Sequence, residues 1–92
     1  ISRLEEDHRK AKELGEILAT LPFIYKVEPI ETNIVIFIFK SDVSETQFID
    51  KLKEKNINIS NMGQGKLRMV THLDYKQVMH DYVMETLSKI SF

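Results

Sequence analysis

The sequence contains no cysteine, only two prolines and three glycines, and no long apolar run. The absence of cysteine excludes disulfide scaffolds, cysteine-based zinc sites and thiol catalysis. The longest apolar stretch, Ile34–Phe39, is far shorter than the roughly 20 residues with which a helix crosses a bilayer. The first residues carry no apolar segment of the signal-peptide type. We therefore expect a cytoplasmic protein with no membrane partner.

An excess of charge of one sign is also missing. There are 13 Lys and Arg against 14 Asp and Glu, which gives a formal net charge of -1. Proteins that bind nucleic acid usually carry a basic excess, so no nucleic-acid partner is expected. With 42% hydrophobic and 29% charged residues, the composition is that of a soluble globular protein, and residues 1–92 are expected to form a single domain.

Three amphipathic segments predict helices. The first runs over Ser2–Thr20 and ends before Pro22, with apolar residues at helical spacing. The second follows a capping-box pattern of Ser44 and Gln47 and ends near Asn56. The third follows Asp74 as N-cap, with Gln77 in the capping-box position. Its expected apolar face is formed by Val78, Met79, Tyr82, Val83, Leu87 and Ile90.

The segments between the helices predict strands. A short strand is expected over Tyr25–Glu28, and Asn33–Phe39 is the clearest strand because it is rich in β-branched and aromatic residues. Ile57–Ile59 alternates with polar residues as a further short strand. Asn61–Gly65 has the composition of a turn, and Lys66–His72 reads as the next strand. This order predicts an α+β fold, a small two-layer sandwich in which helices cover one face of a short antiparallel or mixed sheet.

The strand at Ile34–Phe39 is apolar at every position. Strands with one solvated face normally alternate, whereas continuous apolar strands are buried on both faces. Either one or two of these side chains are simply exposed at an edge, or the second face of the sheet is covered by another domain or subunit. The sequence leaves both interpretations open.

Arg68 is the most suggestive polar residue. Along its strand Leu67, Met69 and Thr71 point one way, and Arg68 points the other way, together with Val70 and His72. If Leu67 and Met69 face the helices, Arg68 faces away from them. An arginine fixed on a strand can bind a planar carboxylate through two parallel hydrogen bonds. On residue type alone, an ordinary surface ion pair is the more common role.

No other pattern predicts a reaction centre in this chain. His72, Asp74 and His80 match no metal-ligand spacing, so no metal is expected. His72 is expected to be a hydrogen-bonded structural residue, and His8 and His80 are expected to be solvated or half-buried without a partner. There is no nucleophile elbow, and Gly63 and Gly65 lie between strands, where no helix N-terminus offers a phosphate site. We therefore assign no catalytic residue to this chain.

Taken together, three blocks resemble the C-terminal domain of L-threonine aldolases, which belong with the aromatic amino acid β-eliminating lyases among the fold-type I pyridoxal-phosphate enzymes. The first block is Glu5–Ala11, the second is Thr32–Val35, and the most specific is Leu67–Asp74, with an Arg followed by Thr-His-x-Asp. The blocks occur in the right order across essentially the whole chain. One departure is Met69, where bulkier aliphatic residues are usual in the family.

The resemblance implies a small domain of a larger enzyme whose N-terminal domain, absent from this sequence, holds pyridoxal phosphate. Arg68 matches the arginine that binds the substrate carboxylate, while Asn33, Thr71 and His72 are second-shell candidates. The implied reaction cleaves L-threonine or L-allo-threonine to glycine and acetaldehyde. The parent enzyme is then a carbon–carbon lyase and a homo-oligomer, and the isolated chain is inactive.

Two alternatives stay open. Another fold-type I enzyme, such as a β-eliminating lyase or an aminotransferase, would share the small-domain layout and the carboxylate-binding arginine. An independent α+β regulatory module would instead bind an amino acid between two copies of this chain, with Arg68 and the same apolar sheet face.

Overall fold

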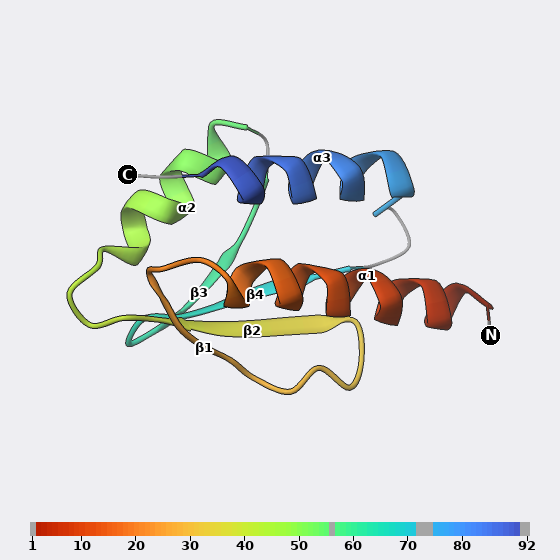
Figure 1. Ribbon diagram of the computed structural model, residues 1–92, viewed down its shortest axis with the longest axis horizontal. Coiled ribbons are helices and arrows are strands. Elements are labelled where there is room, and N and C mark those ends of the chain that lie inside the picture. Colours follow the sequence, from red (N-terminus) through yellow and green to blue (C-terminus); the bar gives the residue numbers. More distant parts are fainter. Residues whose placement is uncertain (1, 56, 72–74, 91–92) are drawn as a thin grey trace.

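The computed structural model describes residues 2–55, 57–71 and 75–90. Its elements are α1 (Ser2–Ala19), β1 (Ile24–Val27), β2 (Ile34–Phe39), α2 (Glu45–Lys53), β3 (Ser60–Gly63), β4 (Lys66–Val70) and α3 (Gln77–Lys89). The four strands form one antiparallel sheet in the order β1-β2-β4-β3. The three helices lie on one side of this sheet (Figure 1). The predicted α+β sandwich is therefore confirmed.

The core lies between the sheet and the helices. β2 contributes Val35, Phe37 and Phe39, and β4 contributes Leu67 and Met69, all of them buried. Each helix adds apolar side chains to the same core: Ala11, Leu14 and Leu18 from α1, Phe48 and Leu52 from α2, and Val83 and Leu87 from α3. Phenylalanine rings at the end of the sheet near α2 pack with centroids 5.0–6.4 Å apart. Aromatic burial on this scale is a main stabilising term in so small a fold.

The helices begin and end close to their predicted positions, but their caps differ from the prediction. α2 follows Ser44, whose hydroxyl bonds to the Thr46 hydroxyl at 2.7 Å and caps no backbone N–H, so the predicted capping box is wrong. α3 has Lys76 as its N-cap and begins at Gln77, so the predicted capping-box position of Gln77 is wrong. The predicted cap Asp74 lies outside the described residues. None of the helices in the described ranges is long and apolar enough to span a membrane.

The predicted strand at Ile57–Ile59 is wrong. Ile57 is buried, and its N–H bonds to the Leu52 carbonyl, so this segment closes the end of α2 and packs under the helical layer. The strand that pairs with β4 is β3, three residues later, and it is exposed throughout. The turn is correspondingly shorter than predicted. Gly63, Gln64 and Gly65 all have positive φ there, at 88°, 58° and 79°.

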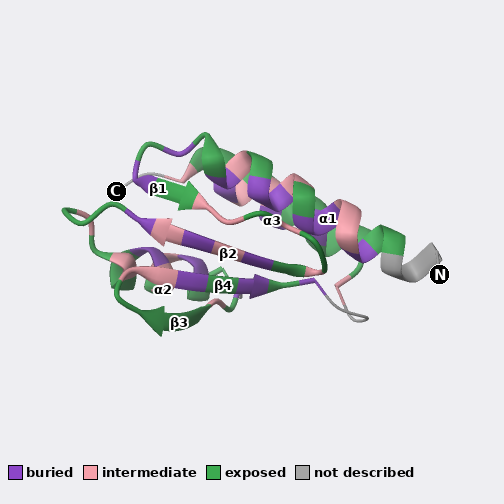
Figure 2. Cartoon of the chain, turned by 90° about the horizontal axis from the view of Figure 1, so that it is seen from below, coloured by how far each residue is buried: buried purple, intermediate pink, exposed green. Residues whose placement is uncertain are grey.

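The second face of the sheet is open. Burial alternates along β2 (Figure 2). Because side chains alternate between the two faces of a strand, Ile34, Ile36 and Ile38 lie on the face away from the helices. Ile34 is 38% exposed and its cross-strand neighbour Val70 is also 38% exposed, while Ile36 and Ile38 are half-buried. Within this chain, nothing described covers these residues. One face of the continuous apolar strand β2 therefore packs in the core, and its other face carries branched aliphatic side chains on the open side of the sheet.

Candidate functional site

Arg68 lies in the middle of the open face. It pairs across β4 and β2 with Ile36, and Ile36 points away from the helices. The arginine side chain is exposed, as predicted, and the described residues offer it no hydrogen bond or ion pair. Ile34 and Val70, which pair with each other on the same face, give it an apolar neighbour on one side. A guanidinium held this way can accept a planar carboxylate from outside the chain.

An acidic and a basic side chain share this face with Arg68. The Glu28 N–H donates to the Ile36 carbonyl at 2.9 Å, which places Glu28 level with Ile36 and therefore with Arg68. Lys66 pairs with Ile38, which lies two residues along β2 from Ile36. Its ammonium lies 3.4 Å from the Glu28 carboxylate, so this ion pair crosses over β2 on the open face. The sequence alone does not predict this pair, because its members lie in strands that only the sheet register brings together.

Asn33 and Thr71 lie together at the other end of β2 and β4. The Asn33 amide donates to the Thr71 carbonyl, and the Thr71 N–H donates to the Asn33 carbonyl at 2.9 Å. Thr71 is fully buried, and its hydroxyl donates to the Asp7 carbonyl of α1 at 2.8 Å. These contacts fix the end of the strand that carries Arg68. His72, the remaining candidate for a supporting hydrogen bond near the substrate site, lies outside the described residues.

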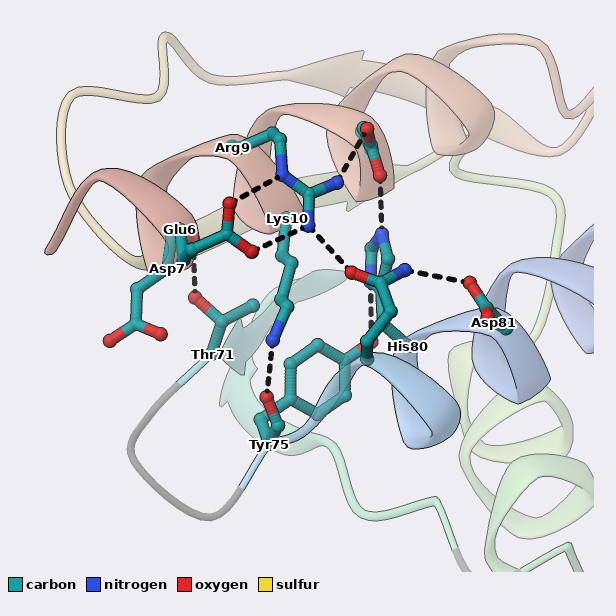
Figure 3. A network of polar contacts seen from close by, with 10 residues as sticks. Glu6, Asp7, Arg9, Lys10, Thr71, Tyr75, His80 and Asp81 are labelled. Carbon is teal, nitrogen blue, oxygen red and sulfur yellow. Dashed lines mark hydrogen bonds and ion pairs between the residues drawn. The ribbon is translucent and has the colours of Figure 1, made fainter. Parts of the chain in front are cut away.

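The connection from β4 to α3 is tied to one turn of α1 on both sides. Thr71 is held by the Asp7 carbonyl, and the Tyr75 carbonyl accepts a 2.8 Å hydrogen bond from Lys10. Lys10 is only 6% exposed, and its ammonium also lies 5.7 Å from the centre of the Tyr75 ring. Figure 3 shows both contacts reaching down from α1. The cation is thus held by a carbonyl and an aromatic ring.

A second polar network joins α1 to α3 through His80. This residue is 1% exposed, and its Nε2 lies 2.6 Å from the Glu13 carboxylate while Nδ1 lies 3.0 Å from the Tyr75 hydroxyl. Glu13 is shared with Arg9, which also bonds to Glu6 and Gln77 (Figure 3). The expectation that His80 would be solvated or half-buried without a partner is wrong. His8 is half-buried as predicted, but the expectation that it has no partner is also wrong, because its Nε2 lies 3.1 Å from the Ile30 carbonyl.

The electrostatics of this network favour charged carboxylates and a neutral tyrosine. The hydrogen bond from His80 holds the pKa of Glu13 below its usual range, and Arg9 lowers that pKa further. Burial raises the pKa of the Tyr75 hydroxyl above its usual range, and the negative charges of Asp81 and Glu13 add to the shift. Every buried side-chain nitrogen and oxygen in the described residues has a hydrogen-bond partner. The buried polar atoms of this network are therefore satisfied by contacts within the chain, which is the pattern of a structural network.

An apolar groove of about 470 Å³ runs beside α3 and is a second candidate binding surface, besides the open face of the sheet. Val78, Met79 and Tyr82 line it and are 47–74% exposed, so the predicted apolar face of α3 is only partly buried. The Tyr82 hydroxyl donates to the Lys55 carbonyl, and the Tyr75 hydroxyl is engaged by His80. Few polar groups thus converge on this groove, whereas Arg68 projects from the open face.

The described residues show no cluster of three or more histidine, aspartate or glutamate side chains that could hold a metal ion. They also provide no cradle for a phosphate group, because Gly63 and Gly65 lie in the turn between β3 and β4. What this site can do chemically is bind an anion at Arg68, on an apolar surface.

No family model matches the sequence, and no curated protein matches it either. Solved structures do match. A cystine C–S lyase in complex with its reaction product, cysteine persulfide, aligns at a TM-score of 0.72 with 16% sequence identity, over 96% of this chain and 24% of the lyase.

A variant of the same lyase, with glycine covalently linked to the pyridoxal-phosphate cofactor, aligns at a TM-score of 0.72 and 16% identity, over 98% of this chain. The chain therefore has the fold of the part of these lyase structures that it matches. The chain spans about a quarter of the length of the structures it matches, 24% in each case.

Proposed function

We propose that this chain is the small domain of a pyridoxal-phosphate lyase of the threonine aldolase type, and that Arg68 binds the substrate carboxylate. The observation that carries the proposal is an exposed arginine, with no acid bound to it in the described residues, on the uncovered face of a sheet. The likeness to a cystine C–S lyase supports a lyase parent. The threonine-type block Leu67–Asp74 favours the aldol reaction over elimination.

The missing cofactor domain is proposed to cover the open face. Ile34, Ile36 and Val70 would be removed from water by this contact, and each Å² of apolar surface so buried contributes roughly 25 cal/mol. Exclusion of water around Arg68 would also strengthen its attraction for a carboxylate, because the local dielectric constant falls. We expect the parent enzyme to be a homo-oligomer in the cytoplasm.

The chain's own contribution to the reaction is orientation. Pyridoxal phosphate, when bound by the other domain, withdraws electrons from the substrate Cα. Arg68, by binding the carboxylate with two parallel hydrogen bonds, would fix the orientation of the substituents at Cα and so favour cleavage of one bond over the others.

The test uses the complete polypeptide that contains this chain. The wild-type enzyme should release acetaldehyde from L-threonine, and Arg68→Lys should raise KM for L-threonine roughly 10- to 100-fold, because an ammonium cannot replace the two-pronged guanidinium. Lys26→Ala, which removes another cation from the same face, is the matched control and should leave KM within about twofold of wild type. An unchanged KM in Arg68→Lys refutes the role of Arg68.

Elimination from a sulfur-containing amino acid is the second candidate, because the structural neighbours are cystine lyases. The same enzyme should then act on L-cystine and leave L-threonine intact. A parent reading frame without a cofactor domain would exclude both lyase candidates and favour the regulatory module, in which two copies of this chain bind an amino acid.

A further inference from the structure

We propose that Lys66 is a positioning residue that holds Glu28 away from Arg68 and so keeps the guanidinium available to a carboxylate ligand. The ligand part of this inference rests on the proposed function of Arg68. The arrangement of the Lys66, Glu28 and Arg68 side chains does not depend on that function and can be tested on its own.

Glu28 is the acid of the open face that stands level with Arg68. Both residues are level with Ile36, one on each side of β2. Two strand spacings separate their backbones, which is about 10 Å. Extended glutamate and arginine side chains bridge such a gap, so Glu28 and Arg68 are geometrically able to form an ion pair across β2.

The reach of Lys66 shows that the gap can be crossed. Lys66 stands level with Ile38, two residues along the sheet from the row of Glu28, yet its ammonium lies 3.4 Å from the Glu28 carboxylate. Arg68 has a longer side chain than Lys66, and its backbone lies closer than that of Lys66 to the row of Glu28. Glu28 nevertheless pairs with Lys66, and Arg68 has no ion-pair partner in the described residues.

An acid of the same face would be a strong competitor for Arg68. A tethered group acts at an effective concentration of the order of millimolar or higher, which is comparable to the concentration of a metabolite. Lys66 offsets this competition by neutralising Glu28. The pair is about one-third exposed on each side, with side-chain accessibilities of 39% for Lys66 and 34% for Glu28, so a single substitution can redirect Glu28 without disturbing the core.

The first experiment uses nuclear magnetic resonance on the 92-residue chain, with the Arg68 Nε–H signal as the readout. Lys66→Met should shift this signal, because Glu28 turns to the guanidinium, and Lys66→Met/Glu28→Gln should restore it. The matched control is Lys26→Met, which removes the other lysine level with Ile38 and should leave the signal in place. An unshifted signal in Lys66→Met, or a shift that persists in the double variant, overturns the proposal.

The second experiment measures KM and kcat for L-threonine in the complete enzyme. Lys66→Met should raise KM roughly two- to fivefold with little change in kcat, the size expected from competition by one exposed ion pair. The double variant should restore KM, and so should Lys66→Arg, which keeps the bridge. If Lys66→Met leaves KM unchanged while Arg68→Lys raises it, this inference fails alone. If Arg68→Lys has no effect, the proposed function fails and the resonance experiment still decides the contact between the side chains.

Discussion

Glu13 connects a buried histidine to a half-exposed arginine. A buried imidazole is stable only when its ring nitrogens have partners, and His80 obtains one from Glu13 on α1 and one from Tyr75 just before α3. Glu13 lies 67 residues before His80 in the chain. The burial of His80 thus depends on a long-range contact that no local pattern predicts.

Glu13 is expected to make the stability of the chain depend on pH in the acid range. Its pKa in the folded state lies below the ordinary value of a glutamate, because His80 and Arg9 stabilise the carboxylate. A lowered folded-state pKa contributes stability above the unfolded value, and this contribution is lost as pH falls from about 4.5 through the folded-state pKa. Chemical unfolding between pH 2 and 7 should therefore show a shallower loss of stability at acid pH for Glu13→Gln than for wild type.

The control for this prediction is Glu16→Gln. Glu16 lies on the same helix, is exposed, and has no ion-pair partner in the described part of the chain. This substitution should leave the acid dependence as in wild type. Equal slopes for wild type and Glu13→Gln would contradict the role of Glu13.

At the scale of elements, the β3–β4 hairpin depends on turn residues that adopt positive φ. Gly65 has φ of 79°, and a methyl group there would lie 3.7 Å from the Phe39 carbonyl oxygen. Gly65→Ala should lower the free energy of unfolding by about 1–2 kcal/mol, because a residue with Cβ is strained in the left-handed region. Urea denaturation measures this. Gln64→Gly, which relieves strain at the neighbouring positive φ, should not lower stability, and a loss there as large as that of Gly65→Ala would contradict the argument.

Sequence patterns predict the elements that bury apolar side chains and miss the ones that do not. β2 and β4 are recognisable because their buried faces are apolar. β3 has the sequence Ser-Asn-Met-Gly and is exposed along its length, so only its hydrogen bonds to β4 define it. The alternation at Ile57–Ile59 comes from packing after α2 and not from strand pairing. In α3 the buried stripe includes His80, which a hydrophobic pattern does not count.

At the scale of the whole molecule, the two faces of the sheet have different energetic roles. Phe37 is fully buried, whereas Ile34 on the other face is 38% exposed. Phe37→Ala should cost about 3–5 kcal/mol of unfolding free energy. Ile34→Thr should cost about 0.5 kcal/mol or less in the isolated chain. Denaturation of both variants measures the difference, and a cost for Ile34→Thr of the same size as for Phe37→Ala would mean that the open face belongs to the core.

The part of the candidate site that depends on strand alternation follows from the sequence. Leu67 and Met69 face the helices, so Arg68 must face away, and the structure places it there. The partners of Arg68 on the open face do not follow, because the register that sets Glu28 and Lys66 beside it joins three separate strands. The substrate-binding role of Arg68 stays a prediction, as does the role of Asn33, Thr71 and His72 in supporting the substrate site through hydrogen bonds.

The anchoring of Thr71 and Tyr75 to a single turn of α1 has a consequence for how the domain moves. Asp7 and Lys10 belong to the same helix, so the end of β4 and the start of α3 are hydrogen-bonded to one rigid element. A shift of β4 relative to α3 would therefore break at least one of these two hydrogen bonds. The strand that carries Arg68 is therefore held rigidly by α1, at the N-terminal end of the chain.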